Sequence, residues 1–172
     1  MTEPDFLTRI LVPIDTSDIA ERAIPWAKII AGSTAEVVLL EVIPVASDVR
    51  TFSGQVIGKA ETIQAGYRQM AEDQLVGAVT KWFASGERVR TVVAAGDPGD
   101  QILAVAAEQD ADLIVMSSHG RGSVGRFISG SVADRIVRQA PIPVMIVGPR
   151  GEIATDGVIN RIVAPIDESE LS

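Results

Sequence analysis

A glycine-rich segment, residues 117–131, holds the groups best suited to bind a ligand in this 172-residue chain. Its four glycines allow the backbone to approach a bound group closely. A helix is predicted to begin at Gly130 and Ser131, where backbone N–H groups and the helix dipole attract an anion. Arg121 and Arg126 add positive charge. The segment therefore predicts a phosphate-binding loop, and a plain glycine-rich turn before an N-capped helix is the alternative.

Other chemistry has weaker support in the sequence. Residues 120–125 match the dinucleotide pattern G-x-G-x-x-G, but that pattern belongs after the first strand and directly before a helix, which is not the context here. His119 has no serine, cysteine or acidic partner at a readable spacing, so no catalytic residue is predicted. Asp15 follows the first apolar run and has two interpretations, a ligand contact or a residue that turns the chain into the next helix.

Five short apolar runs predict the strands that position these residues. They are unbroken by polar alternation, which is typical of parallel strands covered on both faces, and they span residues 10–14, 37–43, 89–95, 113–116 and 144–147. Helical patterns lie between them, and the strand–helix alternation predicts a doubly wound α/β fold: a mainly parallel five-stranded sheet with helices on both faces. Ligands of such sheets lie beyond the carboxyl ends of the strands, where residues 117–131 would lie.

Four helices are predicted between the strands. The first opens at Ser17 and is kinked by Pro25, the longest runs from about Lys59 to Ser85, and the others begin at about Pro98 and Ser131. Apolar side chains at helical spacing are expected to face the core: Ala60, Ile63, Tyr67, Met70, Leu75, Val79 and Phe83 of the longest helix, Ile102, Leu103, Ala106 and Ala107 of the third, and Val132, Ile136 and Val137 of the fourth.

Residues 46–58 show no clear period, which predicts a mobile loop over one end of the sheet. Such a loop could cover a ligand or be a plain surface excursion.

Composition narrows the functional class. The formal net charge of −8 disfavours a nucleic-acid partner. The absence of cysteine and the single histidine exclude disulfides, thiol nucleophiles and the usual zinc sites. The acidic N-terminus and the lack of a long apolar run predict a cytoplasmic protein without a membrane partner.

The loop residues resemble those of the universal stress proteins, whose ATP-binding members carry G-x-x-G, nine residues, then G-[ST]. This chain has Ser117-x-x-Gly120, nine residues, then Gly130-Ser131, so serine replaces the first glycine. The resemblance spans about residues 8–149 and includes further segments: Val12 to Asp15, Val37 to Val42, Gly96-Asp97-Pro98 and Pro143 to Val147.

The resemblance implies a Rossmann-like fold of the adenine nucleotide α-hydrolase type that binds ATP, or ADP or AMP, with or without Mg²⁺. It places Pro13, Ile14, Asp15 and Val42 on the nucleoside side, Met116 and Ser117 beside the nucleoside, and Gly120, Gly130, Ser131 and Val132 at the phosphates, with Arg121 nearby. The implied function is a stress-response signalling module that needs no enzymatic activity and whose nucleotide occupancy alters its partners or oligomeric state. The alternatives are a slow ATP hydrolase and a stress-associated dimer that binds no nucleotide.

The C-terminal residues repeat the first strand. Residues 161–169 match residues 9–17 at six of nine positions, after a linker-like segment rich in glycine and charge. We expect residues 1–149 to form the nucleotide-binding domain and residues 150–172 to be a linker plus an incomplete second unit. In the resembling family the last strand pairs with its counterpart in a second domain, so we also expect a homodimer through this strand and the tail.

Overall fold

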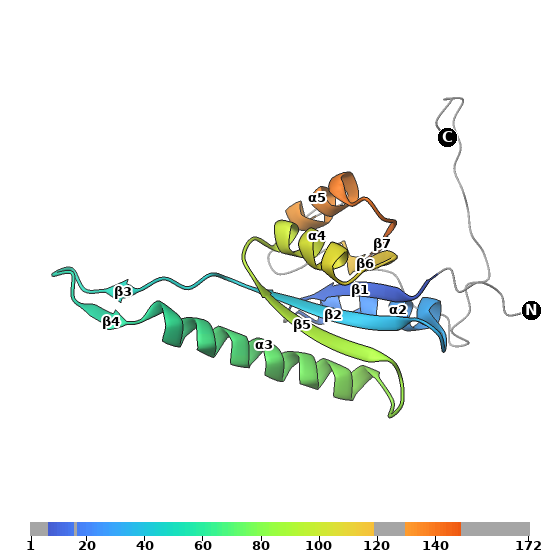
Figure 1. The fold of residues 1–172 in the computed structure, drawn as a ribbon, viewed down its shortest axis with the longest axis horizontal. Coiled ribbons are helices and arrows are strands. Elements are labelled where there is room, and N and C mark those ends of the chain that lie inside the picture. Colours follow the sequence, from blue (N-terminus) through green and yellow to red (C-terminus); the bar gives the residue numbers. More distant parts are fainter. Residues whose placement is uncertain (1–6, 16, 119–129, 149–172) are drawn as a thin grey trace, which may run out of the picture.

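The computed structural model describes residues 7–15, 17–118 and 130–148. They form a parallel five-stranded sheet in the order β5-β2-β1-β6-β7, with helices on both faces (Figure 1), which confirms the predicted fold class. The sheet strands are β1 (Arg9–Ile14), β2 (Glu36–Ile43), β5 (Val89–Ala95), β6 (Leu113–Ser117) and β7 (Val144–Val147). The helices are α1 (Asp18–Glu21), α2 (Ala23–Ala31), α3 (Ala60–Trp82), α4 (Pro98–Glu108) and α5 (Ser131–Gln139).

Side chains of the central strands alternate between two apolar cores. Ile10 and Val12 of β1 face α1, α2 and the C-terminal half of α3, whereas Leu11 faces α4 and α5. The three central strands β1, β2 and β6 are buried on both faces, as their unbroken apolar runs predict. The edge strands β5 and β7 are only partly covered, so the prediction of two-sided burial is wrong for them.

The predicted first helix is two helices. Ser17 caps α1, and its hydroxyl oxygen accepts a hydrogen bond from the Ala20 N–H at 3.2 Å. The break falls at Arg22, which ends α1 and precedes α2, rather than at Pro25. Proline clashes with the carbonyl four residues before it, here that of Glu21, so the helix is interrupted ahead of the proline itself.

Residues 46–58 differ most from expectation. They contain a two-stranded antiparallel hairpin of β3 (Val49–Arg50) and β4 (Val56–Gly58), and Figure 1 shows this hairpin and the start of α3 projecting away from the sheet. A segment without period in the sequence therefore contains a hairpin. It was missed because its two strands are too short to produce a periodic pattern.

The inward-facing positions of the helices are only partly as predicted. In α3 the buried residues are Ala71, Leu75 and Ala78, all from the middle of the helix onward. Four residues expected in the core are exposed: Tyr67 and Met70 of α3, Ala107 of α4 and Val137 of α5. Helical spacing finds an apolar stripe, but the length of the sheet decides how much of that stripe is covered. Among the described residues no helix combines the length and apolar character needed to cross a membrane.

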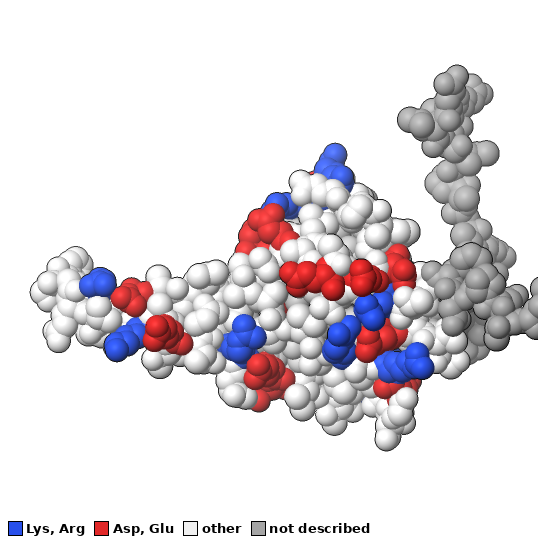
Figure 2. All heavy atoms as spheres, viewed as in Figure 1, with Lys and Arg blue, Asp and Glu red and all other residues white. Residues whose placement is uncertain are grey.

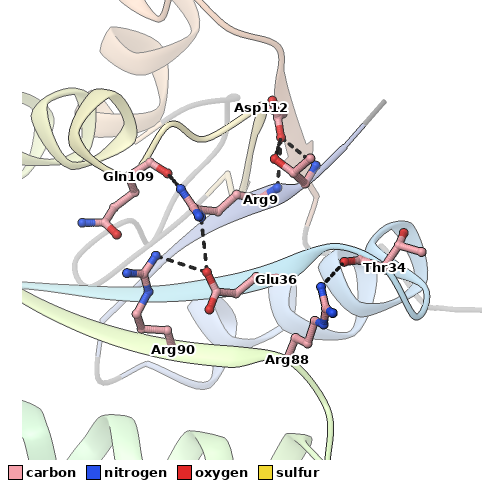
Figure 3. Close-up of polar contacts among 8 residues, drawn as sticks. Arg9, Thr34, Glu36, Arg88, Arg90, Gln109 and Asp112 are labelled. Atoms are coloured by element: carbon pink, nitrogen blue, oxygen red, sulfur yellow. Dashed lines mark hydrogen bonds and ion pairs between the residues drawn. The ribbon is translucent and has the colours of Figure 1, made fainter. Parts of the chain in front are cut away.

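A polar network closes the amino end of the sheet (Figure 3). The Glu36 carboxylate of β2 accepts from Arg9 Nε at 3.2 Å and from Arg90 Nη2 at 3.1 Å, which ties β1 and β5 to the strand between them. The Asp112 carboxylate accepts from the backbone N–H groups of Thr8 and Arg9 at 2.7 and 2.9 Å, and from the Thr8 hydroxyl. The network fixes the start of β1 against the residue that precedes β6.

Replacing Asp112 by asparagine is expected to lower the free energy of unfolding at pH 7 by about 1 kcal/mol. The pKa of the Asp112 carboxyl group is lowered mainly by the hydrogen bond from the Thr8 N–H. The hydrogen bonds from the Arg9 N–H and the Thr8 hydroxyl lower the pKa further, whereas burial raises it. A group with a lowered pKa in the folded state stabilises the fold above its unfolded pKa of about 3.9, and this contribution is lost as the pH falls through the folded pKa.

Urea unfolding of the Asp112→Asn variant and the parent from pH 7 to pH 2 measures this contribution. The difference between them should be largest near neutral pH and shrink below about pH 4. Glu108→Gln, which changes an exposed carboxylate at the end of α4, is the matched control and should follow the parent. A constant difference at every pH would show that the carboxylate charge of Asp112 does not stabilise the strand start.

Candidate functional site

A cavity of about 270 Å³ lies at the carboxyl ends of the central strands. It is bounded by the end of β1 and the turn after it, by β2, by the end of β6, and by the first turns of α4 and α5. The residues that line it are Pro13, Ile14, Asp15, Ala20, Leu40, Val42, Pro98, Ile102, Met116, Ser117, Ser118, Ser131, Val132 and Ala133. Its volume is close to the lower end of the range for small-molecule sites, about 300–1,000 Å³.

The parallel register brings these residues together. Ile14 is opposite Glu41 in the pairing of β1 with β2, so Val42 lies one residue beyond the last paired position of β1. Met116 and Ser117 are the last residues of β6, on the other side of β1. Because parallel strands end at the same edge of a sheet, residues from three separate segments of the chain meet in one cavity.

Asp15 shapes the turn at one end of the cavity. Its Oδ1 atom accepts hydrogen bonds from the Ser17 N–H, at 2.9 Å, and from the Ser17 hydroxyl. Ser17 in turn caps α1. Asp15 therefore has the turn-forming role that the sequence left open, and it also lines the cavity, so the two interpretations of this residue are compatible.

The N-terminus of α5 forms another part of the cavity wall. Gly130 is its N-cap residue, and Ser131 and Val132, the first two helical residues, line the cavity. The first N–H groups of a helix have no partner within it, which gives such a terminus a partial positive charge. The Gly130 N–H itself donates to the Ser118 carbonyl oxygen at 3.0 Å, which attaches the start of α5 to the end of β6.

An ion-pair cluster holds the two helix starts side by side. Arg135 of α5 donates to the carboxylate of Asp97, the N-cap residue of α4, at 2.8 Å, and it also pairs with Asp100. Gly99 allows this approach, since a Cβ atom there would lie 2.8 Å from Arg135 Cδ. The cluster therefore links α4, which contributes Pro98 to the cavity, to α5, which contributes Ser131.

The cavity contains eight of the eleven residues singled out from the sequence: Pro13, Ile14, Asp15, Val42, Met116, Ser117, Ser131 and Val132. Gly130 is adjacent, at the cap of α5. Gly120 and Arg121 lie outside the described residues.

Six lining residues were not singled out from the sequence: Ala20, Leu40, Pro98, Ile102, Ser118 and Ala133. Two of them could have been found from the sequence. Ser118 directly follows the last residue of β6, and Pro98 directly follows Asp97, the N-cap residue of α4. The four apolar residues could not, since a cavity wall and a core position have the same sequence pattern.

Comparison with known proteins assigns the family. The family model for the universal stress protein family matches residues 7–148. A universal stress protein of Methanocaldococcus jannaschii is 31% identical over 141 residues, which cover 81% of each chain.

Solved structures with the same fold agree with this assignment. The universal stress protein UspA of Lactobacillus plantarum has a TM-score of 0.65 at 27% identity and covers 81% of this chain and 97% of its own. Two further universal stress proteins, both 22% identical, show the same fold. One was solved in complex with cAMP (TM-score 0.56; 83% and 97% covered), and the other, from Archaeoglobus fulgidus, in complex with dAMP (TM-score 0.53; 82% and 98% covered). The matched residues include nearly all of the sheet, its helices and the cavity, and the chain belongs to the universal stress protein family.

Proposed function

We propose that this chain binds an adenine nucleotide in the cavity at the carboxyl ends of β1, β2 and β6. The observation that carries the proposal is the arrangement of the cavity. Its wall combines apolar side chains, including Ile14, Val42 and Met116, with the Asp15 carboxylate and the N-terminus of α5. A nucleotide has the matching set of groups, with an apolar base face, hydroxyl groups on the ribose and an anionic phosphate.

Two family members solved with cAMP and dAMP support the adenine base as the common element. Both ligands carry a single phosphate, whereas the proposal for this chain extends to ATP, ADP and AMP, with or without Mg²⁺. Within it, Pro13, Ile14, Asp15 and Val42 contact the nucleoside, and Met116 and Ser117 lie beside it. The phosphates bind at Ser131 and Val132 next to Gly130, together with Gly120 and Arg121.

The activity that follows is binding and signalling rather than turnover. Anchoring by backbone N–H groups holds phosphates in place, while hydrolysis also requires a base that activates water. Nucleotide occupancy would then alter the contacts of the chain with its partners or with a second copy. The exposed edge of β7 is the proposed site of pairing in a homodimer, together with the tail, because an apolar edge strand is a template for a second strand. Ile146 of this strand is exposed.

Equilibrium dialysis against ATP, ADP, AMP and cAMP, each with and without Mg²⁺, tests the binding proposal. We expect saturable binding of ATP with a dissociation constant in the micromolar range or weaker, which corresponds to a binding free energy no more favourable than about −8 kcal/mol. Phosphate release measured in the same samples tests for hydrolysis. The proposal is wrong if the folded chain binds none of these nucleotides, and a steady release of phosphate would favour the slow hydrolase.

A further inference from the structure

Exposed apolar surface is concentrated in one region of the molecule, residues 45–70, which we name the arm. It comprises the segment after β2, the β3–β4 hairpin and the first half of α3 (Figure 1). Of the eleven large apolar residues that are exposed in the described part of the chain, seven lie in the arm: Val45, Val49, Phe52, Val56, Ile57, Tyr67 and Met70. The arm therefore holds more exposed large apolar side chains than the rest of the described surface.

The sheet supports α3 only from the middle of the helix onward. Ala71, Leu75 and Ala78 are buried against β2 and β5. The buried Glu41 of β2 adds a polar anchor, because the Gln74 amide, turned to donate, reaches its carboxylate at 2.7 Å. Before Ala71 the apolar spacing of the helix continues through Ile63, Tyr67 and Met70, but the stripe extends beyond the sheet.

The arm has its own polar framework. The Gln64 side chain accepts from the Ala46 N–H at 2.8 Å and donates to the Pro44 carbonyl at 3.2 Å. The Asp48 carboxylate accepts from the Ala60 N–H at 3.0 Å and pairs with Arg50 at 3.1 Å. These bonds hold the hairpin against the start of α3 while leaving the apolar side chains outside, an arrangement suited to a docking surface.

A surface of this size fits a protein partner. Together the seven residues expose the equivalent of about four whole residues. At roughly 150–200 Å² for each large apolar residue, that amounts to roughly 600–800 Å², close to the area of about 800 Å² that one partner contributes to a stable interface. A short hairpin is at best marginally stable when alone in water, so covering it also stabilises it.

Charge favours a second copy of the chain as this partner. The arm has three basic residues (Arg50, Lys59 and Arg68) and two acidic ones (Asp48 and Glu61), a net charge of +1. The described residues outside the arm include eight basic and fourteen acidic ones, a net charge of −6. Figure 2 shows a mainly white arm with a few charges of both signs, beside a body on which acidic residues form several patches with basic residues among them. In a two-fold symmetric pair, each copy would contribute one arm and receive one.

We propose that the arm docks on the acidic body of a second copy of this chain. The contact is separate from pairing of β7 strands, because α3 lies against β2 and β5 whereas β7 forms the opposite edge of the sheet. A chain that used both contacts would form assemblies larger than a dimer.

Sedimentation of a Phe52→Ser/Ile57→Ser/Met70→Ser variant tests the proposal. We expect self-association of the parent, and a dissociation constant at least roughly 30-fold higher in the variant, since exposed anchors of this kind dominate interfaces. Association of the parent should also weaken at high salt. Val76→Ser is the matched control. Val76 lies on the same helix and is 63% exposed, against 61% for Met70. It follows Met70 by six residues and therefore points to a different side of the helix. It should associate like the parent.

A second measurement covers the case in which the triple variant does not fold. The chain has no cysteine, so Gln55→Cys and Thr80→Cys each provide a single labelling site, the first in the hairpin and the second near the end of α3. A fluorophore at position 55 should become shielded from a soluble quencher as the protein concentration rises, and one at position 80 should not. A parent that stays monomeric, or equal association by parent and triple variant, overturns the proposal.

Discussion

Replacing Gly130 by valine is expected to weaken ATP binding by at least roughly 100-fold while changing the stability of the fold by less than about 1 kcal/mol. Gly130 has φ −56° and ψ 147°, a conformation that any residue adopts, so the backbone does not require glycine at this cap. We attribute the requirement for glycine to the ligand. A branched side chain at the cap would lie beside the first N–H groups of α5, where the phosphates are proposed to bind.

Titration calorimetry with ATP, together with thermal unfolding, separates the two effects. Gly130→Ala should lie between the parent and the valine variant, since it adds a single methyl group. Gly77→Ala is the control for replacement of a glycine elsewhere: a Cβ atom at Gly77 of α3 meets no atom within 4 Å, so binding should be unchanged. If Gly130→Val binds ATP as tightly as the parent does, the phosphates do not lie at this helix terminus.

The fold could be predicted from the sequence because its strands are marked by unbroken apolar runs. The runs at residues 10–14, 37–43 and 113–116 fall within the three central strands β1, β2 and β6. Burial of a central parallel strand on both faces leaves this signal, and the strand–helix alternation then limits the topology. The runs do not specify the order of the strands in the sheet. They therefore do not show that β5 and β7 are edge strands, which are only partly buried.

The arm could not be predicted because helical spacing describes one face of a helix and not what lies against it. Tyr67 and Met70 fit the same stripe as Leu75, yet Leu75 is buried under the sheet and the other two are exposed. The difference depends on where β2 and β5 end relative to α3, which is a tertiary property. Two residues expected in the core, Tyr67 and Met70, are thus part of the proposed docking surface.

Polar residues that line the cavity could be singled out from the residue pattern, whereas most of its apolar wall could not. Ser131 could be placed at a helix start by the glycine before it, and Asp15 at a strand end by the apolar run before it. Ile102 and Ala20 line the cavity from helices whose other residues form the core. Only the packing of α4 and α1 against the sheet shows which of their apolar residues border empty space.

Asp15→Ala is expected to lower both ATP affinity and stability, and Asp15→Asn to lower mainly the affinity. Alanine removes the acceptor for the Ser17 N–H and hydroxyl, and with it the turn that leads into α1. Asparagine keeps one oxygen that can accept from Ser17 but lacks the negative charge that would accept hydrogen bonds from the ribose or hold a water on Mg²⁺. Loss of one hydrogen bond to a charged group, about 1.5–3 kcal/mol, corresponds to an affinity roughly 10–100-fold lower.

Dialysis against ATP and thermal unfolding of both variants distinguish the two roles of Asp15. If the carboxylate contacts the nucleotide, Asp15→Asn should melt near the parent temperature and bind ATP roughly 10-fold or more weakly, while Asp15→Ala should be impaired in both measurements. Parent-like affinity in Asp15→Asn, combined with a lowered melting temperature in Asp15→Ala, would restrict Asp15 to forming the turn with Ser17. The nucleoside end of the cavity would then depend on Pro13, Ile14 and Val42 alone, which offer shape and backbone groups but no charge.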